Sequence, residues 1–327
     1  MVVPVQRVAV IGASHWHAPL YLAALAESGV HVVAVTDPDG TLAEQLAAPL
    51  AAASGADIDA VLDQTEPDLA VVLGRHDAMA ASARAVAERG IPMVLEKPGA
   101  LSLAELTALE RQLRGCAVAV PLVHRFAPFA DALRALGPLT QLSISYLVGP
   151  PDRYPAAHSP WMLDPAAGGG VLANLGPHFT DLVMQLGGSV TDVAARTSAA
   201  RHGLPIEDHA VLVLTTDAGL TATIEVGYLF PAVPSKRHVN ITASGPGGTV
   251  AIGPSGTVLR TGPDGTAEDQ IDVDSDPLFG PFVARALDTY GTGFDGLPGL
   301  TDLVAAMRVV DAAYREAGRP GGRAWAM

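Results

Sequence analysis

The chain has 327 residues, a length that predicts two domains, and 49% of them are hydrophobic, too many for a disordered protein. Its 34 acidic and 20 basic residues give a net charge of −14, which argues against nucleic acid or an anionic membrane as a partner, because both need a basic surface. With one cysteine, Cys116, and neither a signal-peptide pattern nor an apolar run of membrane-spanning length, we expect a soluble, cytoplasmic protein without disulfides.

Residues 1–123 alternate between short apolar runs and segments with a helical pattern. The predicted strands cover residues 7–12, 31–36, 69–73, 92–95 and 117–123. The predicted helices cover residues 19–28, 41–53, 77–89 and 102–113. This alternation predicts an α/β domain, residues 1–123, with a doubly wound parallel sheet of the Rossmann type.

From residue 124 the rhythm changes, and several strands follow one another directly. The predicted strands cover residues 139–148, 190–198, 209–216, 220–230, 238–244 and 249–252. The predicted helices cover residues 126–136, 171–186, 279–290 and 300–317. We therefore expect an α+β domain, residues 124–327, with a large, mostly antiparallel open sheet that serves substrate binding and oligomerisation. The stretch 149–170, rich in Pro and Gly, is long for a loop and is expected to be functional.

The predicted strand at 220–230 carries apolar side chains on both faces. Ile224, Val226 and Tyr228 lie on one side, and Ala222, Glu225 and Leu229 are among the rest. Helices can cover only one face of such a sheet, so the other face is expected to pair with a second copy of the chain. We therefore expect a homodimer or a homotetramer.

The sequence GASHWH, which begins at Gly12, follows the first predicted strand, where a dinucleotide-binding domain has Gly-x-Gly-x-x-Gly. Only Gly12 matches; Ser14, whose hydroxyl can bond a phosphate oxygen, and His17 replace the second and third glycines. His15 and Trp16 stand where this turn faces a pyrophosphate and a nicotinamide. Histidines with this spacing alone make a poor zinc site, so no metal is expected. The alternative is a Rossmann-like domain that binds no nucleotide.

Asp37 follows the second predicted strand, close to the acidic position expected roughly 20 residues after the turn. A carboxylate there binds the ribose hydroxyls of NAD and repels the additional phosphate of NADP. No arginine follows directly in the sequence. We therefore expect NAD as the cofactor rather than NADP, unless Arg75 reaches the ribose pocket.

Glu96-Lys97-Pro98 follows the predicted strand 92–95, and parallel sheets bind ligands beyond the carboxyl ends of their strands. The chain has 18 arginines but only two lysines, Lys97 and Lys236. A lysine that persists against such a bias is a candidate for a chemical role. Lys236, in a loop-like context, is interpreted as an ordinary residue, and the alternative for Lys97 is a surface lysine at a turn.

A third candidate is the sequence GGGVLANLGPHFTD, which begins at Gly168. Its three glycines permit close approach of the backbone to a bulky ligand. Asn174 and His178 share a face if this segment is helical, which would place Pro177 near the helix start, and Asp181 lies close to that face. The alternative for His178 is a buried histidine with a purely structural role.

Three residues of the long loop could line a substrate pocket: Tyr154, His158 and Trp161. The Trp161 ring is suited to stacking on a sugar. An apolar anchor for the loop is an equally good interpretation of Trp161.

With these motifs the chain resembles the Gfo/Idh/MocA family, named after glucose–fructose oxidoreductase, inositol dehydrogenase and rhizopine catabolism. The resemblance covers nearly the whole chain. It rests on residues 8–12 with Asp37, 83–98, Arg125 with Pro128, Trp161 with the three glycines, His178 with Asp181, and 311–320. It implies an N-terminal Rossmann domain, a C-terminal domain with a large open sheet, an oligomer, and oxidation or reduction of sugars, cyclitols and related polyols with NAD or NADP.

The chain departs from the family pattern at three places. Asn174 stands where the family usually has Asp, and the glycine pattern of the first turn is reduced. Met79 stands about 17 residues before Glu96, where many members carry His.

Oxidation of a secondary alcohol requires that a hydride leave the carbon and a proton leave the hydroxyl. His178 is the expected general base, and a protonated Lys97 would stabilise the alkoxide. Asn174 can bond the substrate but carries no charge, so the pKa of Lys97 should be lower than beside an Asp. Lys97 and His178 lie in different predicted domains, so only an interdomain cleft would bring them together.

Two other functions stay open. The first is an enzyme that uses bound NAD transiently, for glycoside cleavage or elimination, without net formation of NADH. The second is a non-catalytic, NAD-binding regulatory paralogue, which the reduced glycine pattern and Asn174 would suit.

Overall fold

The computed structural model describes residues 6–231 and 237–318, so Lys236 and the last residues of the segment 311–320 lie outside the described residues. The chain forms two compact units. The first consists of the chain up to Pro121 together with Tyr154–Trp161 and Phe279–Val304. The second consists of Leu122–Arg153, Met162–Leu278 and the chain from Ala305 onward. The division after Pro121 lies close to the boundary expected at residue 123. The two expected domains are each continuous in sequence, whereas two later segments of the chain belong to the first unit.

Both returning segments make specific contacts within the first unit. Helix α9 (Phe279–Thr289) packs against α1 (Ala18–Glu27), with the Tyr21 and Phe279 rings 5.4 Å apart. In the shorter segment, the Ser159 hydroxyl donates to the Ser14 carbonyl at 2.6 Å. These contacts join positions far apart in the chain, so local sequence patterns carry no sign of them.

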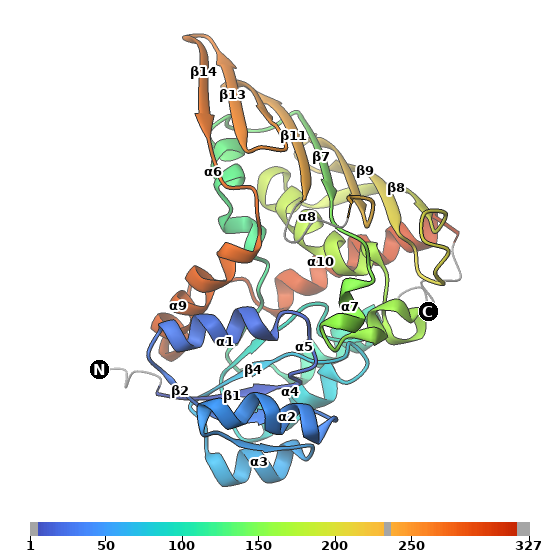
Figure 1. The fold of residues 1–327 in the computed structure, drawn as a ribbon. Coiled ribbons are helices and arrows are strands. Elements are labelled where there is room, and N and C mark those ends of the chain that lie inside the picture. Colours follow the sequence, from blue (N-terminus) through green and yellow to red (C-terminus); the bar gives the residue numbers. More distant parts are fainter. Residues whose placement is uncertain (1–5, 232–236, 319–327) are drawn as a thin grey trace. The chain divides into compact units, whose positions relative to one another are not determined.

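The first unit is built on a six-stranded parallel sheet with the order β3-β2-β1-β4-β5-β6, as Figure 1 shows in part. Its strands are β1 (Arg7–Ile11), β2 (His31–Thr36), β3 (Ala53–Gly55), β4 (Leu69–Val72), β5 (Met93–Leu95) and β6 (Val118–Ala119). Its other helices are α2 (Gly40–Ala47), α3 (Ile58–Thr65), α4 (Met79–Glu88) and α5 (Leu103–Gln112). The central strand β4 is buried along its whole length, as an apolar parallel strand should be. The doubly wound sheet is confirmed.

Two elements of this unit were not predicted from the sequence. β3 is a three-residue edge strand of small side chains, too short and too polar to give an apolar run. α3 follows it and is capped by Asp57, whose carboxylate accepts from the Ala60 N–H at 3.1 Å. That cap was the signal available for α3.

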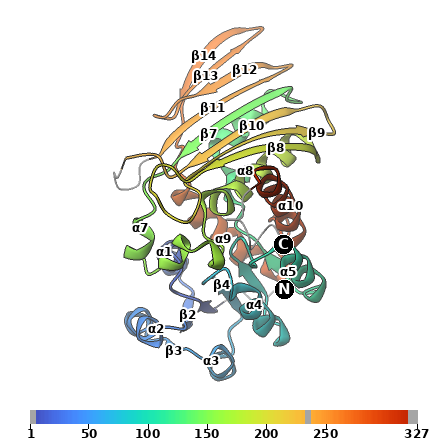
Figure 2. The same ribbon diagram turned by 90° about the vertical axis from the view of Figure 1, so that its right-hand side faces the viewer.

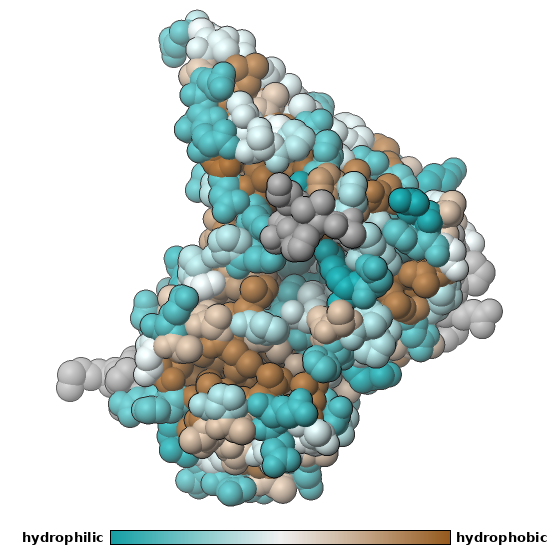
Figure 3. Space-filling model, viewed as in Figure 1, coloured by the Kyte–Doolittle hydropathy of each residue, from teal (hydrophilic) through white to brown (hydrophobic). Residues whose placement is uncertain are grey.

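The second unit contains an eight-stranded sheet with the order β14-β13-β12-β11-β7-β10-β9-β8, which can be followed in Figure 2. Its strands are β7 (Gln141–Leu147), β8 (Val190–Ser198), β9 (His209–Thr216), β10 (Thr221–Gly227), β11 (His238–Gly245), β12 (Gly248–Ile252), β13 (Thr257–Gly262) and β14 (Gly265–Gln270). Only β7 and β10 pair in parallel, so the predicted, mostly antiparallel sheet is confirmed. The strands β13 and β14 were not predicted because they are polar, and β14 is exposed throughout; their tip is mostly teal and white in Figure 3.

Helices of the second unit cover one face of its sheet. α8 (Val171–Gly187) packs on β9 and β10, and α6 (Pro128–Arg134) contacts α8 and β12. α10 (Leu300–Glu316) belongs to this unit from Ala305 onward, and there the Thr180 hydroxyl of α8 donates to the Ala306 carbonyl at 3.2 Å. The long loop contains a short helix, α7 (Arg153–Ala156). None of the helices in residues 6–231 and 237–318 combines the length and apolar character that crossing a bilayer demands.

The two faces of β10 differ from the expectation. Ala222, Ile224 and Val226 all lie on the buried face, because they alternate in step along the strand. The opposite face of β10 carries Thr221, Thr223 and Glu225, so the expectation that this strand is apolar on both faces was wrong. The large apolar side chains that the sheet exposes are instead Val213 on β9 and Leu259 on β13, which are 42% and 43% exposed.

Candidate active site

The turns after β1 and β4 meet where the strand order of the first unit reverses. Gly12 has a φ of +77° and Gly74 a φ of +94°. A Cβ atom on Gly12 would lie 2.6 Å from the Gly74 Cα, so only glycine allows this approach. A doubly wound sheet binds its ligand beyond such a reversal. The structure therefore places Gly12 where a dinucleotide is expected, and adds Gly74, which the sequence did not single out.

Asp37 lies at the end of β2 and is buried in the turn. Its carboxylate accepts from the Ser14 N–H at 2.7 Å and from the Asp39 N–H at 3.0 Å. A carboxylate offers about four lone-pair positions, so these two bonds leave capacity for the hydroxyls of a ribose. Arg75, the residue that could have favoured NADP, is instead bonded to Asp77 through two side-chain nitrogens at 2.8 and 3.0 Å.

The side chains of the β1–α1 turn form a ring stack. The His15 ring lies on the Trp16 ring with centroids 3.8 Å apart and an angle of 24° between the planes. Burial lowers the pKa of His15 well below its usual range, and the nearby charges of His17, Lys97 and His76 lower it further. His15 is therefore a neutral imidazole at neutral pH.

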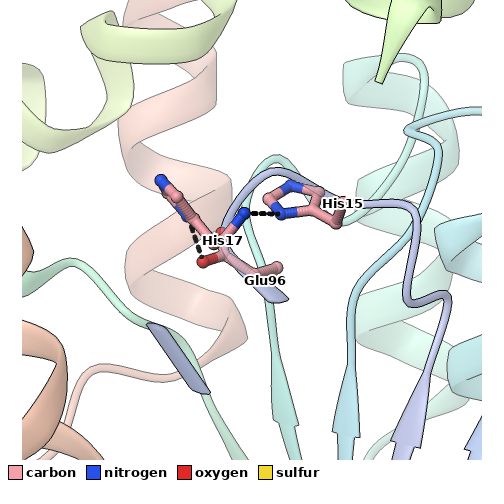
Figure 4. A group of neighbouring side chains, drawn as sticks. All are labelled: His15, His17 and Glu96. Carbon is pink, nitrogen blue, oxygen red and sulfur yellow. Dashed lines mark hydrogen bonds and ion pairs between the residues drawn. The ribbon is translucent and has the colours of Figure 1, made fainter. Parts of the chain in front are cut away.

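Glu96, directly after β5, is fully buried and accepts three hydrogen bonds. Its Oε1 contacts His17 Nδ1 at 2.8 Å, a pair drawn in Figure 4, and the Tyr21 hydroxyl at 3.1 Å. Its Oε2 accepts from the Lys97 backbone N–H at 2.9 Å. His17 and Tyr21 lie four residues apart at the start of α1, a spacing that puts both on one face of the helix. The sequence showed that spacing and singled out Glu96, but nothing in it paired Glu96 with His17 and Tyr21.

These contacts decide the charge of Glu96. Burial alone would raise the pKa of its carboxyl, but the charge and hydrogen bond of His17, the Lys97 ammonium and the Tyr21 hydroxyl outweigh burial and lower the pKa. The same site raises the pKa of Tyr21 well above its usual range, first through burial and then through Glu96. Glu96 is thus an ionised carboxylate inside the first unit.

Lys97 is buried beside Glu96, with 1% of its surface exposed. Its Nζ lies 4.9 Å from the centre of the Trp16 ring, within the range of a cation–π contact. Burial lowers the pKa of Lys97 to about 8, against the opposing charge of Glu96. This amine can therefore change its protonation state near neutral pH. Pro98 follows it across a cis peptide bond.

His15, His17 and Glu96 offer ligand atoms that all lie within 4.8 Å of one another, and Figure 4 shows the three side chains together. One nitrogen of each ring is already engaged within the protein: His15 Nδ1 accepts from the His17 backbone N–H at 3.1 Å, and His17 Nδ1 bonds Glu96. The absence of a metal from the function stays a prediction.

The returning segment brings aromatic side chains to this turn. Trp161 is 4.7 Å from the His76 ring and 5.7 Å from the Trp16 ring, and Tyr154 is 5.2 Å from Trp16, measured between centroids. Two of the three residues expected to line a substrate pocket thus contact this turn, with Trp161 packed as an anchor. His158 is exposed, with a φ of +58°, and does not join this group. His76 is fully buried and was not singled out from the sequence.

The glycines before α8 serve the second unit's own packing. A Cβ on Gly169 would lie 2.3 Å from the Met162 carbonyl oxygen, and a Cβ on Gly170 would lie 2.3 Å from the Glu207 carboxylate. Glu207 in turn accepts from the Leu172 N–H at 3.0 Å, at the start of α8. The expectation that these glycines make room for a bulky ligand is corrected, because protein atoms fill that space at Gly169 and Gly170.

α8 carries Asn174, His178 and Asp181, and all three are buried. The expectation that Pro177 marks the helix start was wrong, because α8 begins at Val171 and continues through Pro177. Asn174 Nδ2 donates to the Tyr228 hydroxyl at 3.2 Å. His178 lies beside His124, with ring centroids 4.7 Å apart.

Asp181 forms a two-pronged ion pair with Arg125. Arg125 Nε and a terminal guanidinium nitrogen donate to the two carboxylate oxygens at 2.6 and 2.5 Å. Both side chains are largely buried, and two-pronged, charge-assisted pairs of this kind are among the stronger hydrogen-bonded contacts in proteins. Because Lys97 belongs to the first unit and Asn174 and His178 to the second, their joint action on one substrate is a functional proposal.

Comparison with known proteins identifies related sequences for both units. Residues 6–120 match the family model described as an oxidoreductase family with an NAD-binding Rossmann fold, and residues 132–251 match the GFO/IDH/MocA C-terminal domain. A D-apiose dehydrogenase from Paraburkholderia graminis is 26% identical over 149 residues, which are 43% of this chain and 39% of that protein. The alignment thus spans about two fifths of that relative's length.

Solved structures share the fold over nearly the whole chain. An oxidoreductase from Agrobacterium radiobacter, solved with NAD+, L-tartaric acid and magnesium, has a TM-score of 0.85 at 19% identity and covers 96% of each chain. WlbA dehydrogenase from Bordetella pertussis, with NADH and UDP-GlcNAcA, has a TM-score of 0.81 at 18% identity and covers 97% of each chain. Levoglucosan dehydrogenase, with NADH and levoglucosan, has a TM-score of 0.80 at 16% identity, with 96% of this chain and 97% of that chain covered.

Proposed function

Because the chain belongs to the Gfo/Idh/MocA oxidoreductase family, we propose that it transfers a hydride between NAD and a secondary alcohol of a sugar, a sugar derivative or a cyclitol. The family membership of the first unit supplies an NAD-binding Rossmann domain. The names of D-apiose dehydrogenase and levoglucosan dehydrogenase support the substrate class. The lone cysteine, which needs no oxidising compartment, supports a cytoplasmic location.

The residues of the first unit fit a dinucleotide. Gly12 and Gly74 place no side chains beyond β1 and β4, where the strand order reverses. The Asp37 carboxylate at the end of β2 can accept further hydrogen bonds. With Arg75 bonded to Asp77, the ribose position stays acidic, which favours NAD over NADP. A dinucleotide held by these residues would supply the hydride chemistry of the reaction.

The proton of the reaction is assigned to Lys97, and the observation that carries this proposal is its buried position beside the ionised Glu96. With a pKa lowered to about 8, the neutral amine can accept a proton from an alcohol during oxidation. In the reverse direction the ammonium donates that proton and stabilises the developing alkoxide. Glu96, held by His17 and Tyr21, supports the ammonium form.

Residues of the second unit complete the proposed site. His178 is assigned a role as the general base that works with Lys97, and Asn174 a role in bonding a substrate hydroxyl. The Tyr228 hydroxyl accepts from Asn174 Nδ2 and thereby fixes the orientation of the amide. Tyr154 and His158 stay candidates for substrate contact.

The test is a panel of polyols, sugars and sugar phosphates, each incubated with enzyme and NAD and followed at the NADH absorbance band. Net NADH formation with at least one compound, abolished in Lys97→Met, is the expected result. Product formation without net NADH would show transient use of NAD instead. Binding of NAD in calorimetry with no turnover of any compound would show a regulatory paralogue.

A homodimer or homotetramer is also proposed. The face of the second unit's sheet that carries Val213 and Leu259 exposes apolar side chains among polar ones, which suits a two-fold interface. Light scattering at micromolar concentration should give a multiple of the chain mass, and Val213→Asp should reduce it. A wild-type mass equal to that of one chain would contradict the proposal.

A further inference from the structure

Two ring nitrogens in the first unit are buried without a hydrogen-bond partner among the described residues: His15 Nε2 and Trp161 Nε1. His15 is 1% exposed and Trp161 is 5% exposed, and their ring centroids are 6.1 Å apart. A buried polar group without a partner is costly, so each such atom calls for an explanation, such as an ordered water, an ion or a bound ligand. Trp161 Nε1 can only donate a hydrogen bond.

The protein's own contacts show that His15 Nε2 is also a donor. Its Nδ1 accepts from the His17 backbone N–H at 3.1 Å, and a ring nitrogen that accepts carries no proton. Because the ring is neutral, its one proton is on Nε2. Stacking on Trp16 fixes the ring plane, so this donor is held in one direction.

Backbone donors of the β1–α1 turn are largely used within the protein. Gly12 and Ala13 both donate to the Thr36 carbonyl, at 2.8 and 3.0 Å. Ser14 donates to Asp37 at 2.7 Å and His17 to the His15 ring. A turn with three glycines would present such N–H groups to a pyrophosphate. Here the second and third glycines are Ser14 and His17, and their N–H groups point elsewhere.

The two side-chain donors lie at the reversal of the strand order. His15 belongs to the turn after β1, and the Trp161 ring packs on His76, which follows β4. The Ser159 hydroxyl, which donates to the Ser14 carbonyl, fastens the Trp161 segment to the same turn. Ligands of a doubly wound sheet bind at this reversal.

We propose that His15 Nε2–H and Trp161 Nε1–H bind the diphosphate of NAD, in place of the backbone N–H groups that a glycine-rich turn would offer. This proposal rests on the proposed function, because it assumes the dinucleotide. It gives His15 and Trp161 a positioning role toward the cofactor and removes Trp161 from the residues expected to stack on a sugar.

Calorimetry with three ligands tests the proposal: NAD, ADP-ribose, which keeps the diphosphate but lacks nicotinamide, and adenosine, which lacks both. The variants His15→Phe and Trp161→Phe keep an aromatic ring and lose the N–H. His31→Gln, an exposed histidine at the start of β2, is the control. Each ring variant should bind NAD and ADP-ribose roughly 10-fold to 100-fold more weakly, with adenosine unchanged.

Three outcomes would overturn the inference. Unchanged ADP-ribose binding in both variants would show that neither donor reaches the diphosphate. A loss confined to NAD would place the donors on the nicotinamide, and an equal loss with adenosine would show general damage to the fold. If the wild type binds neither NAD nor ADP-ribose, the proposed function itself fails, which is a distinct result.

Nitrogen NMR of the unmutated protein gives a second readout that does not depend on how a variant folds. His15 should show the Nε2–H tautomer, and ADP-ribose should shift both this N–H and one indole N–H of the three tryptophans. Trp161→Phe identifies the indole signal. An Nδ1–H tautomer, or an indole signal of Trp161 that does not move with ADP-ribose, would contradict the proposal.

Discussion

Glu96 in the first unit and Asp181 in the second are both buried carboxylates, but different partners hold them. Glu96 is bonded by the His17 ring and the Tyr21 hydroxyl, and it lies beside the Lys97 amine, whose pKa is lowered to about 8. Asp181 is held by the guanidinium of Arg125, which keeps its charge at any working pH. The first arrangement is suited to proton exchange and the second to a fixed link between α8 and residues 123–126. Substitutions in the first should therefore change the reaction, and substitutions in the second should change stability.

The largest effect is expected from Lys97→Met, which removes the proposed proton carrier and keeps an apolar chain of similar length. Turnover should fall roughly 10²-fold to 10⁴-fold while the Kd for NAD changes little. Lys236→Met, at the other lysine of the sequence, is the control. Near-normal turnover of Lys97→Met would contradict the assignment of the proton to Lys97.

His178→Ala should reduce turnover by a similar factor, roughly 10²-fold to 10⁴-fold, because it removes the second proposed proton-transfer group. The double variant with Lys97→Met should be little worse than the worse single variant, since groups that act on one proton are not additive. Single-turnover kinetics measures both. If His178→Ala alone turns over normally, Lys97 acts alone and His178 has a structural role.

Arg125→Leu should destabilise the second unit by about 3–5 kcal/mol, because it leaves the Asp181 carboxylate buried without its cation. Urea unfolding of the whole chain measures the loss. Arg260→Leu is the matched control, because its partner Asp269 is exposed and such pairs are worth at most about 1 kcal/mol. Equal, small losses for both variants would show that the buried pair does not hold α8.

Glu96→Gln should move the pH profile of alcohol oxidation to lower pH. The Glu96 charge raises the pKa of Lys97, so its removal should bring that pKa below about 8 and make the neutral amine available sooner as pH rises. The measurement is kcat/KM against pH for both proteins. An unchanged midpoint, or one that moves upward, would contradict the proposed influence of Glu96 on Lys97.

The smallest effect is expected from Asn174→Asp, which restores the carboxylate usual in the family. If Asn174 and Lys97 act on one substrate, the new charge should raise the pKa of Lys97 and move the same midpoint to higher pH. Asp164→Asn, an exposed change in the opposite direction, is the control. A midpoint that stays in place would show that Asn174 does not influence Lys97.

The fold was largely predictable where burial leaves a pattern in the sequence. The strands β1 and β4 are apolar because both of their faces are covered, and β10 alternates because only one face is. Elements without such burial were missed, as at the polar hairpin of β13 and β14. The faces of β10 were misassigned although the alternation of Ala222, Ile224 and Val226 was present to be read.

The candidate site was predictable only in part. Lys97 and Asp37 were found because strand ends of a parallel sheet collect functional groups. Contacts such as His17 with Glu96 join positions 79 residues apart, and no local pattern encodes their meeting. The same holds for the contact between Trp161 and His76. Trp161 comes from a loop in the middle of the chain, and this contact joins it to the first unit.

Titration of the Lys97 amine itself tests most directly whether this lysine is a buried proton carrier. The chain has only two lysines, so NMR of isotope-labelled lysine side chains can follow both across neutral and alkaline pH, and Lys236→Met identifies the signal of Lys97. A Lys97 signal with its midpoint near pH 8, moving lower in Glu96→Gln, is the predicted result. A midpoint at the ordinary lysine value of about 10.4, unaffected by Glu96→Gln, would contradict it.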